Sequence, residues 1–174
     1  MKSQTSAECG RKMTEKDSFL SDLDMPLSYL AVLQIMRLFI QSVSHPPSMA
    51  WMAALSGADE TFDATYGPQI ASRTLEALQM VRMSRRSLFH FNSPSCPSCC
   101  QIVTEHERRF MRALDNIHNG STGQARMELI MLCEGNDVAP ALDAMERLSQ
   151  LIQASQLSNT QSFESPDTIE RRVN

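Results

Sequence analysis

The stretch PLSYLAVLQIMRLFIQSV, from Pro26 to Val43, is the sequence that decides the fold. Asp24 can cap a helix that begins here, and a proline in the first turn favours such a start. Apolar residues lie around most of the helical circumference, which is typical of a helix at the centre of a core. His45-Pro46-Pro47 ends the pattern, because proline lacks the amide donor that a helix needs. We therefore predict one central, buried helix.

Arg37, in the middle of this run, argues against a membrane span. Residues 27–43 are short for a membrane-crossing helix and also contain Gln34 and Gln41. On insertion scales, a central arginine costs about 2.5–3.5 kcal/mol in a bilayer. The polar residues after Met1 lack the apolar segment of a secretion signal. We expect no membrane partner and a cytoplasmic location.

Helical patterns also follow this run. Ser48 and Gly57 bound a short helix over residues 49–55, and a longer helix over residues 68–86 follows a turn at residues 66–68. The apolar spacing of the longer helix points four side chains inward, namely Ile70, Leu75, Leu78 and Val81.

The C-terminal half begins with a capping box, in which Thr104 is the N-cap and Glu107 the third helical residue. The helix that it starts ends near His118, and two more helices are predicted over residues 122–133 and 137–155. Very short turns join these three helices and favour antiparallel packing. The predicted fold class is all-α, a single small domain of five to six helices.

Composition predicts the limits of this domain. We predict a flexible N-terminal arm over residues 1–24, a helical domain over residues 25–155 and a disordered tail over residues 156–174. The domain divides into an N-terminal helical half (25–87), a Cys-rich loop (88–103) and a three-helix C-terminal half (104–155). The arm and the tail are polar and lack apolar periodicity, so neither is expected to bury a core.

Three of the five cysteines lie in the loop, as Cys96-Pro97-Ser98-Cys99-Cys100. In a reducing cytosol, clustered cysteines favour metal binding or reactivity over structural disulfides. Cys-x-x-Cys spacing lets two thiolates bind one ion, and a structural zinc site takes four ligands. No second Cys-x-x-Cys pair is present, so the other ligands must come from single residues. The predicted zinc site consists of Cys96, Cys99, Cys133 and His106.

Two other interpretations of these cysteines stay open. Cys96, Cys99 and Cys100 are candidates for thiol redox chemistry, either as a sensor or in an oxidoreductase. Residues 88–103 resemble the active-site loop of glutaredoxins and other thioredoxin-like proteins, which implies an oxidoreductase, but the flanking sequence lacks the strands of that family. In the third interpretation the thiols pack as small apolar groups.

Positive charge is concentrated in residues 73–112, which carry seven arginines, three glutamates and no lysine, although the whole chain has a net charge of −4. This block predicts, as an alternative function, a nucleic-acid-binding surface. A pI of about 5.5 argues against strong nonspecific binding. The candidate residues are Arg82, Arg85, Arg86, Arg108, Arg109 and Arg112.

No set of residues in this sequence has the pattern of a catalytic site, so we expect a protein that is not an enzyme. Among enzyme classes, a thiol oxidoreductase fits the sequence best. The 12 methionines suit adaptable binding surfaces as well as cores. We predict a cytoplasmic regulatory or adaptor protein that binds another protein, and a nucleic-acid-associated transcriptional regulator is the alternative. The apolar surface of the central helix leaves a homodimer open.

Overall fold

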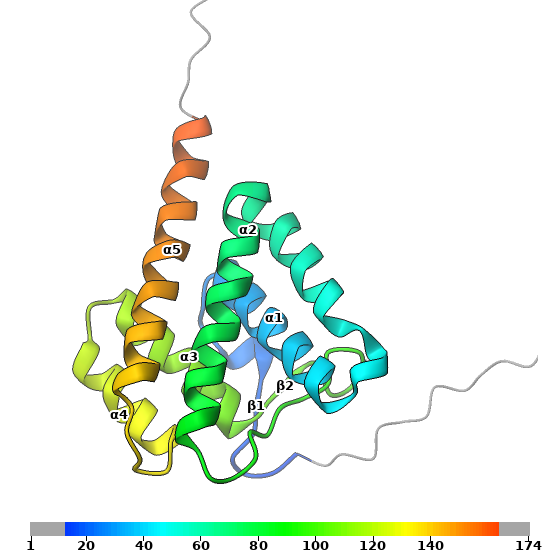
Figure 1. The fold of residues 1–174 in the computed structure, drawn as a ribbon, viewed down its shortest axis with the longest axis vertical. Helices are drawn as coiled ribbons and strands as arrows, with labels where there is room; N and C mark the ends of the chain where they lie inside the picture. The colour runs from blue at the N-terminus through cyan, green and yellow to red at the C-terminus, as the bar shows by residue number, and fades with distance from the viewer. Residues whose placement is uncertain (1–12, 164–174) are drawn as a thin grey trace, which may run out of the picture.

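The computed structural model describes residues 13–163, with side chains up to residue 158. Its described part confirms the predicted all-α class, because five α-helices account for most of it and strands for four residues (Figure 1). Two short 3₁₀ helices also occur, η1 (Leu20–Asp22) and η2 (Pro46–Ser48). The remaining elements are β1 (Ser18–Phe19), α1 (Leu27–Ser44), α2 (Ala50–Ser84), β2 (Ile102–Val103), α3 (Glu105–His118), α4 (Thr122–Leu132) and α5 (Ala139–Phe163).

Helix α1 lies at the centre of the core, as its apolar circumference predicts. Tyr29, Val32, Leu33 and Met36 are completely buried, and the helix packs most extensively on α2. Among the described residues, α1 alone has the length and apolar composition of a membrane-crossing helix, a property that core helices share.

Helix α2 bends sharply at Asp63, whose φ of 62° and ψ of 170° are not helical. The Asp63 carboxylate accepts hydrogen bonds from the amides of Thr65 (2.7 Å) and Tyr66 (3.2 Å), so it caps the arm that follows. The expected stop at Gly57 and turn at residues 66–68 are therefore wrong. Residues other than glycine rarely adopt this combination of φ and ψ, and at Asp63 the carboxylate supplies the acceptor that the two following amides lack.

The bend divides α2 into a first arm (50–62) and a second arm (64–84), which form a V in Figure 1 with α1 between them in that view. Gly67 allows the arms to approach each other closely. A Cβ atom at Gly67 would lie 2.6 Å from the Cα atom of Asp59, which is shorter than any ordinary contact. The core residue Phe62 is 2% exposed and lies next to the bend.

Residues 13–24 contact the domain, whereas the sequence predicts a flexible arm there. Ser18 pairs with Val103 and Phe19 with Ile102, so β1 and β2 form an antiparallel ribbon. Leu20 and other apolar residues after the strand pack against the core. Residues 13–24 are held in place because β1 pairs with β2, which lies far along the chain. Local sequence does not reveal such a pairing. Residues 1–12 of the predicted arm lie outside the described residues.

The capping box that begins α3 is confirmed: Thr104 accepts from the Glu107 amide at 3.1 Å, and Glu107 accepts from the Thr104 amide at 2.8 Å. Helices α4 and α5 follow as predicted, but α5 packs mainly on α2 rather than on α4. Helix α5 thereby joins the two halves of the domain.

Helix α5 continues to Phe163, although the sequence predicts a disordered tail from residue 156. Ser155 is 1% exposed, and its hydroxyl donates to the Ile152 carbonyl at 2.7 Å. The Gln156 amide donates to the Ser28 hydroxyl at 2.9 Å. Polar side chains here bond to the helix and to α1, so the polar composition does not end the helix. Residues 164–174 of the predicted tail lie outside the described residues.

Candidate functional site

A buried ion pair lies beneath the Cys-rich loop. Arg37 on α1 donates to both carboxylate oxygens of Glu107 on α3, at 2.7 and 3.1 Å, and both side chains are completely buried. Arg37 also donates to the carbonyl oxygens of Cys100 and Ile102, both at 2.7 Å. All three guanidinium nitrogens therefore have an acceptor, which a buried arginine requires. The pair fixes the end of the loop against α1.

The Glu107 carboxylate also organises the other end of the loop. It accepts the Asn92 amide at 3.0 Å, while the Asn92 side chain donates to the Ile102 carbonyl at 2.6 Å. The Thr104 hydroxyl donates to the His90 carbonyl at 2.8 Å. These contacts satisfy the buried polar groups of the cluster, so its role in this geometry is to hold residues 90–104 in place.

The three clustered cysteines lie within one turn. The Cys100 amide donates to the Cys96 carbonyl at 2.9 Å, and the Cys100 thiol donates to the Pro97 carbonyl at 3.2 Å. Cys99 is 4% exposed, whereas Cys96 and Cys100 are half-buried. None of the four described cysteines forms a disulfide with another described residue. The loop thus brings the three redox candidates close together in one turn, and thiol–disulfide chemistry requires such closeness.

The predicted zinc quartet is not assembled. Cys133 is completely buried at the end of α4, where burial raises the pKa of its thiol. His106 lies in the first turn of α3, with Nδ1 accepting the His90 amide at 2.9 Å. Within residues 13–163, no group of three or more His, Cys, Asp or Glu side chains is arranged to hold a metal ion. Zinc binding itself stays a prediction.

His106 is surrounded by hydrogen-bond donors and positive charge. Arg85 Nη2 lies 3.3 Å from its Nε2, and the His90 ring stacks on it with centroids 5.0 Å apart. Burial, and then the charges of Arg85 and His90, lower the pKa of His106 to about 4. A protonated ring would present N–H groups to two donors, so His106 is neutral at pH 7.

Two of the six candidate arginines are used by the fold. Arg85 is 9% exposed; it donates to the Leu132 carbonyl and pairs with Glu134 at 3.3 Å. Arg109 pairs with Glu105 at 2.8 Å and with Glu128 at 3.1 Å. The other four form no ion pair with the described part of the chain, and these are Arg82, Arg86, Arg108 and Arg112. Arg85 and Arg109 are therefore engaged within the fold, and nucleic-acid binding by the six arginines stays a prediction.

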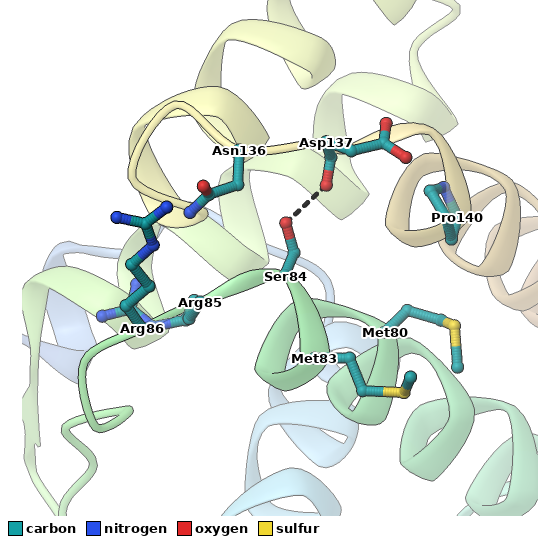
Figure 2. A pocket seen from close by; sticks show the side chains of 8 residues that line it. All are labelled: Met80, Met83, Ser84, Arg85, Arg86, Asn136, Asp137 and Pro140. Atoms are coloured by element: carbon teal, nitrogen blue, oxygen red, sulfur yellow. Dashed lines mark hydrogen bonds between the residues drawn. The ribbon is translucent and has the colours of Figure 1, made fainter.

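A hollow of about 420 Å³ lies between the end of α2 and the turn that precedes α5, and Figure 2 shows the side chains that line it. Met80 and Met83 lie on one side of it, and Asn136 on the other. Two of its polar side chains already have partners: the Ser84 hydroxyl donates to the Asp137 carbonyl, and the Asn136 amide donates to the Cys133 carbonyl at 2.9 Å. Of the other lining side chains, Arg86 forms no ion pair with the described part of the chain.

A second surface feature is mainly apolar. A hollow of about 440 Å³ lies between the C-terminal end of α1 and the two arms of α2, and it shares Val43 and Leu75 with a smaller hollow beside it. That hollow shares Leu88 and Phe89 with a third one along residues 88–91. We call these three adjoining hollows together the apolar groove.

The apolar groove has a buried floor and an exposed rim. Phe39, Ile40 and Leu78 form the floor and are 3–8% exposed. Solvent contacts the rim residues, which are Val43 (57% exposed), Trp51 (41%), Leu55 (38%), Leu75 (42%) and Leu88 (81%). Exposed apolar side chains that cluster around a depression are typical of a binding surface, whereas isolated ones are common on any protein.

Comparison with protein-family models, with curated proteins and with solved structures finds no match to this chain. We therefore infer the function from the geometry of the described residues.

Neither the buried pair nor the apolar groove follows from the sequence motifs. Arg37 gives a signal, because an arginine within an apolar helix needs a buried carboxylate, but its partner is 70 residues away. The rim residues give no such signal in the sequence, since their helical spacing is the same as that of buried core residues.

Proposed function

We propose that this chain is a non-enzymatic regulatory or adaptor protein that binds a partner protein through the apolar groove. The observation that carries the proposal is the row of exposed apolar side chains along a buried floor, from Trp51 to Leu88. Water gains freedom when such a row is covered, so a complementary apolar surface binds there favourably. Hot-spot side chains of protein interfaces are enriched in tryptophan, and the only Trp of the chain lies on this rim.

The polar clusters support the same proposal indirectly. Both nitrogens of His106 face donors, and the Glu107 carboxylate is completely buried beneath the loop. These are the groups that a catalytic site would use as a base, and here they hold α3 and the loop together. The exposed side chains of the apolar groove, in contrast, do not hold described elements together in this way.

A peptide library tests this proposal. Random 16-residue peptides would be selected for binding to the immobilised full chain and then measured against two surface variants. Val43→Asp puts a charge on the rim, while Met127→Asp changes a residue of α4 that is equally accessible, at 60% exposure. We expect selected peptides to bind Met127→Asp normally and to lose at least about tenfold in affinity for Val43→Asp. Equal binding to both variants, or no selectable peptide, would overturn the proposal.

A further inference from the structure

The walls of the apolar groove determine what kind of segment it can hold. From Pro68 to Arg82 the walls are helices, whose backbone groups are bonded within α1 and α2. An extended peptide would find no backbone partners there, so strand addition gains nothing along this length. A helical peptide satisfies its own backbone groups and presents only side chains. The walls therefore favour a helix.

The length and charge of the groove define that helix further. Pro68 and Arg82 are 14 residues apart on the second arm of α2, which corresponds to about 21 Å, or roughly four helical turns. Arg82 lies at one end of this helix-walled stretch, is exposed, and donates only to Gln79 at 3.4 Å among the described residues. No aspartate or glutamate is among the described residues that line the groove. One end of the stretch from Pro68 to Arg82 is thus positively charged, and the rest of it is nearly uncharged.

We infer that the occupant is an amphipathic helix of a partner protein, about four turns long, with its apolar stripe on Val43 and Leu75 and an acidic side chain beside Arg82. This inference rests on the proposed function and adds the chemistry of the partner. The apolar stripe supplies most of the affinity, and the acidic residue sets the direction of binding, since rim charges act on orientation and association rate.

Three synthetic peptides test the inference on the full chain by fluorescence anisotropy at low salt. The first is a 16-residue amphipathic peptide with leucines at helical spacing and glutamate in its first and last turns. The second replaces both glutamates with lysine. The third differs from the first only by two prolines on its polar face, which prevent a helix. We expect the first peptide to bind about fivefold more tightly than the second and at least tenfold more tightly than the third.

A charge reversal makes the test specific. Arg82 is exposed and has no ion pair in the described part of the chain, so Arg82→Glu is not expected to disturb the fold. The variant should prefer the lysine peptide to the glutamate peptide. Arg112→Glu, on α3, should leave the preference unchanged. Equal affinity of the glutamate and lysine peptides for the unaltered chain would overturn the acidic requirement, and full binding of the proline peptide would overturn the helix.

Other outcomes separate this inference from the proposed function. If all three peptides bind equally and Val43→Asp abolishes their binding, the groove is a binding surface but the helical, acidic partner is wrong. If Val43→Asp has no effect on any peptide, the proposed function fails as well. A dimer of this chain that Val43→Asp dissociates would make a second copy the occupant and overturn the inference. Binding of duplex DNA, lost in Arg82→Glu, with no peptide binding would overturn it in favour of nucleic acid.

Discussion

Helix α1 contains two regions that contradict simple expectations in opposite ways. Arg37, its only charged residue, is completely buried, whereas Val43, less than two turns later, is 57% exposed. The arginine is stable inside because Glu107 and two carbonyl groups satisfy it. Val43 lies outside because the described chain places no element over the end of α1. Polarity alone therefore does not decide which side chain is buried; the available partners do.

The largest expected effect is on the buried pair. Arg37→Ala would leave the Glu107 carboxylate buried without its counter-charge, and we expect a loss of about 3–5 kcal/mol of unfolding free energy. Urea denaturation measures it. Arg112→Ala, which removes an exposed arginine without an ion pair in the described chain, is the matched control and should change stability by less than about 0.5 kcal/mol. Similar losses in the two variants would contradict the role given to the pair.

The close approach of the two arms of α2 should give the next largest effect. Gly67→Ala would push a Cβ atom against the Asp59 backbone, and we expect a loss of about 1–3 kcal/mol. Gly57→Ala is the opposite case, because nothing lies within 4 Å of its Cβ position inside the helix. That substitution should stabilise the protein by up to about 1 kcal/mol. Thermal melting of the two variants compares them directly, and a stable Gly67→Ala protein would show that the arms can separate.

The pH dependence of stability should report on His106. Its pKa of about 4 in the folded chain lies below the usual 6.5, so the unfolded chain binds the extra proton first. The contribution of neutral His106 to the unfolding free energy is therefore complete above about pH 6.5, and it is lost as the pH decreases towards 4. Urea midpoints between pH 7 and 4.5, where carboxylates remain mostly ionised, measure this loss. His106→Gln should flatten the profile, and an unchanged slope in that variant would assign the loss to other groups.

The rim of the apolar groove should contribute little to stability. Leu75→Asp changes a side chain that is already 42% exposed, so we expect less than about 1 kcal/mol of change. A loss of several kcal/mol, by chemical denaturation, would mean that Leu75 is a core residue and not a rim residue.

Metal removal should have the smallest effect of all. If Cys96, Cys99, Cys133 and His106 stay as separate as the described residues place them, a chelator should leave the melting temperature unchanged. Metal analysis of the purified, reduced protein is the parallel measurement. One zinc per chain with a chelator-sensitive melting temperature would show that Cys96, Cys99, Cys133 and His106 come together after all.

Local signals predicted much of this fold. The prolines after α1, the capping box of Thr104 and Glu107, and the apolar spacing of α3 to α5 each depend on neighbours in sequence, and the structure confirms them. The bend at Asp63 was missed because glycine and proline are the usual breakers, and both are present within five residues of it. An aspartate that caps its own helix gives a weaker signal.

Long-range pairing explains the remaining differences. Leu75 has the spacing of a core residue, but periodicity marks an apolar face without showing whether another element covers it. Glu107 is recognisable as a capping residue, while its second role depends on an arginine 70 residues away. His106 and Cys133 had plausible spacing for a metal site, yet each is bound into separate local contacts.

Trp51 provides the most direct test of the apolar groove as a binding surface, because it is the only tryptophan and lies on the rim. Titration of the full chain with the glutamate-containing helical peptide should shift its emission to shorter wavelength, as the indole loses contact with water. Met131→Asp, at a site on α4 that is 57% exposed, should give the same shift, and Leu75→Asp should give none. An unchanged Trp51 spectrum at saturating peptide, or an equal shift in Leu75→Asp, would contradict binding in the groove.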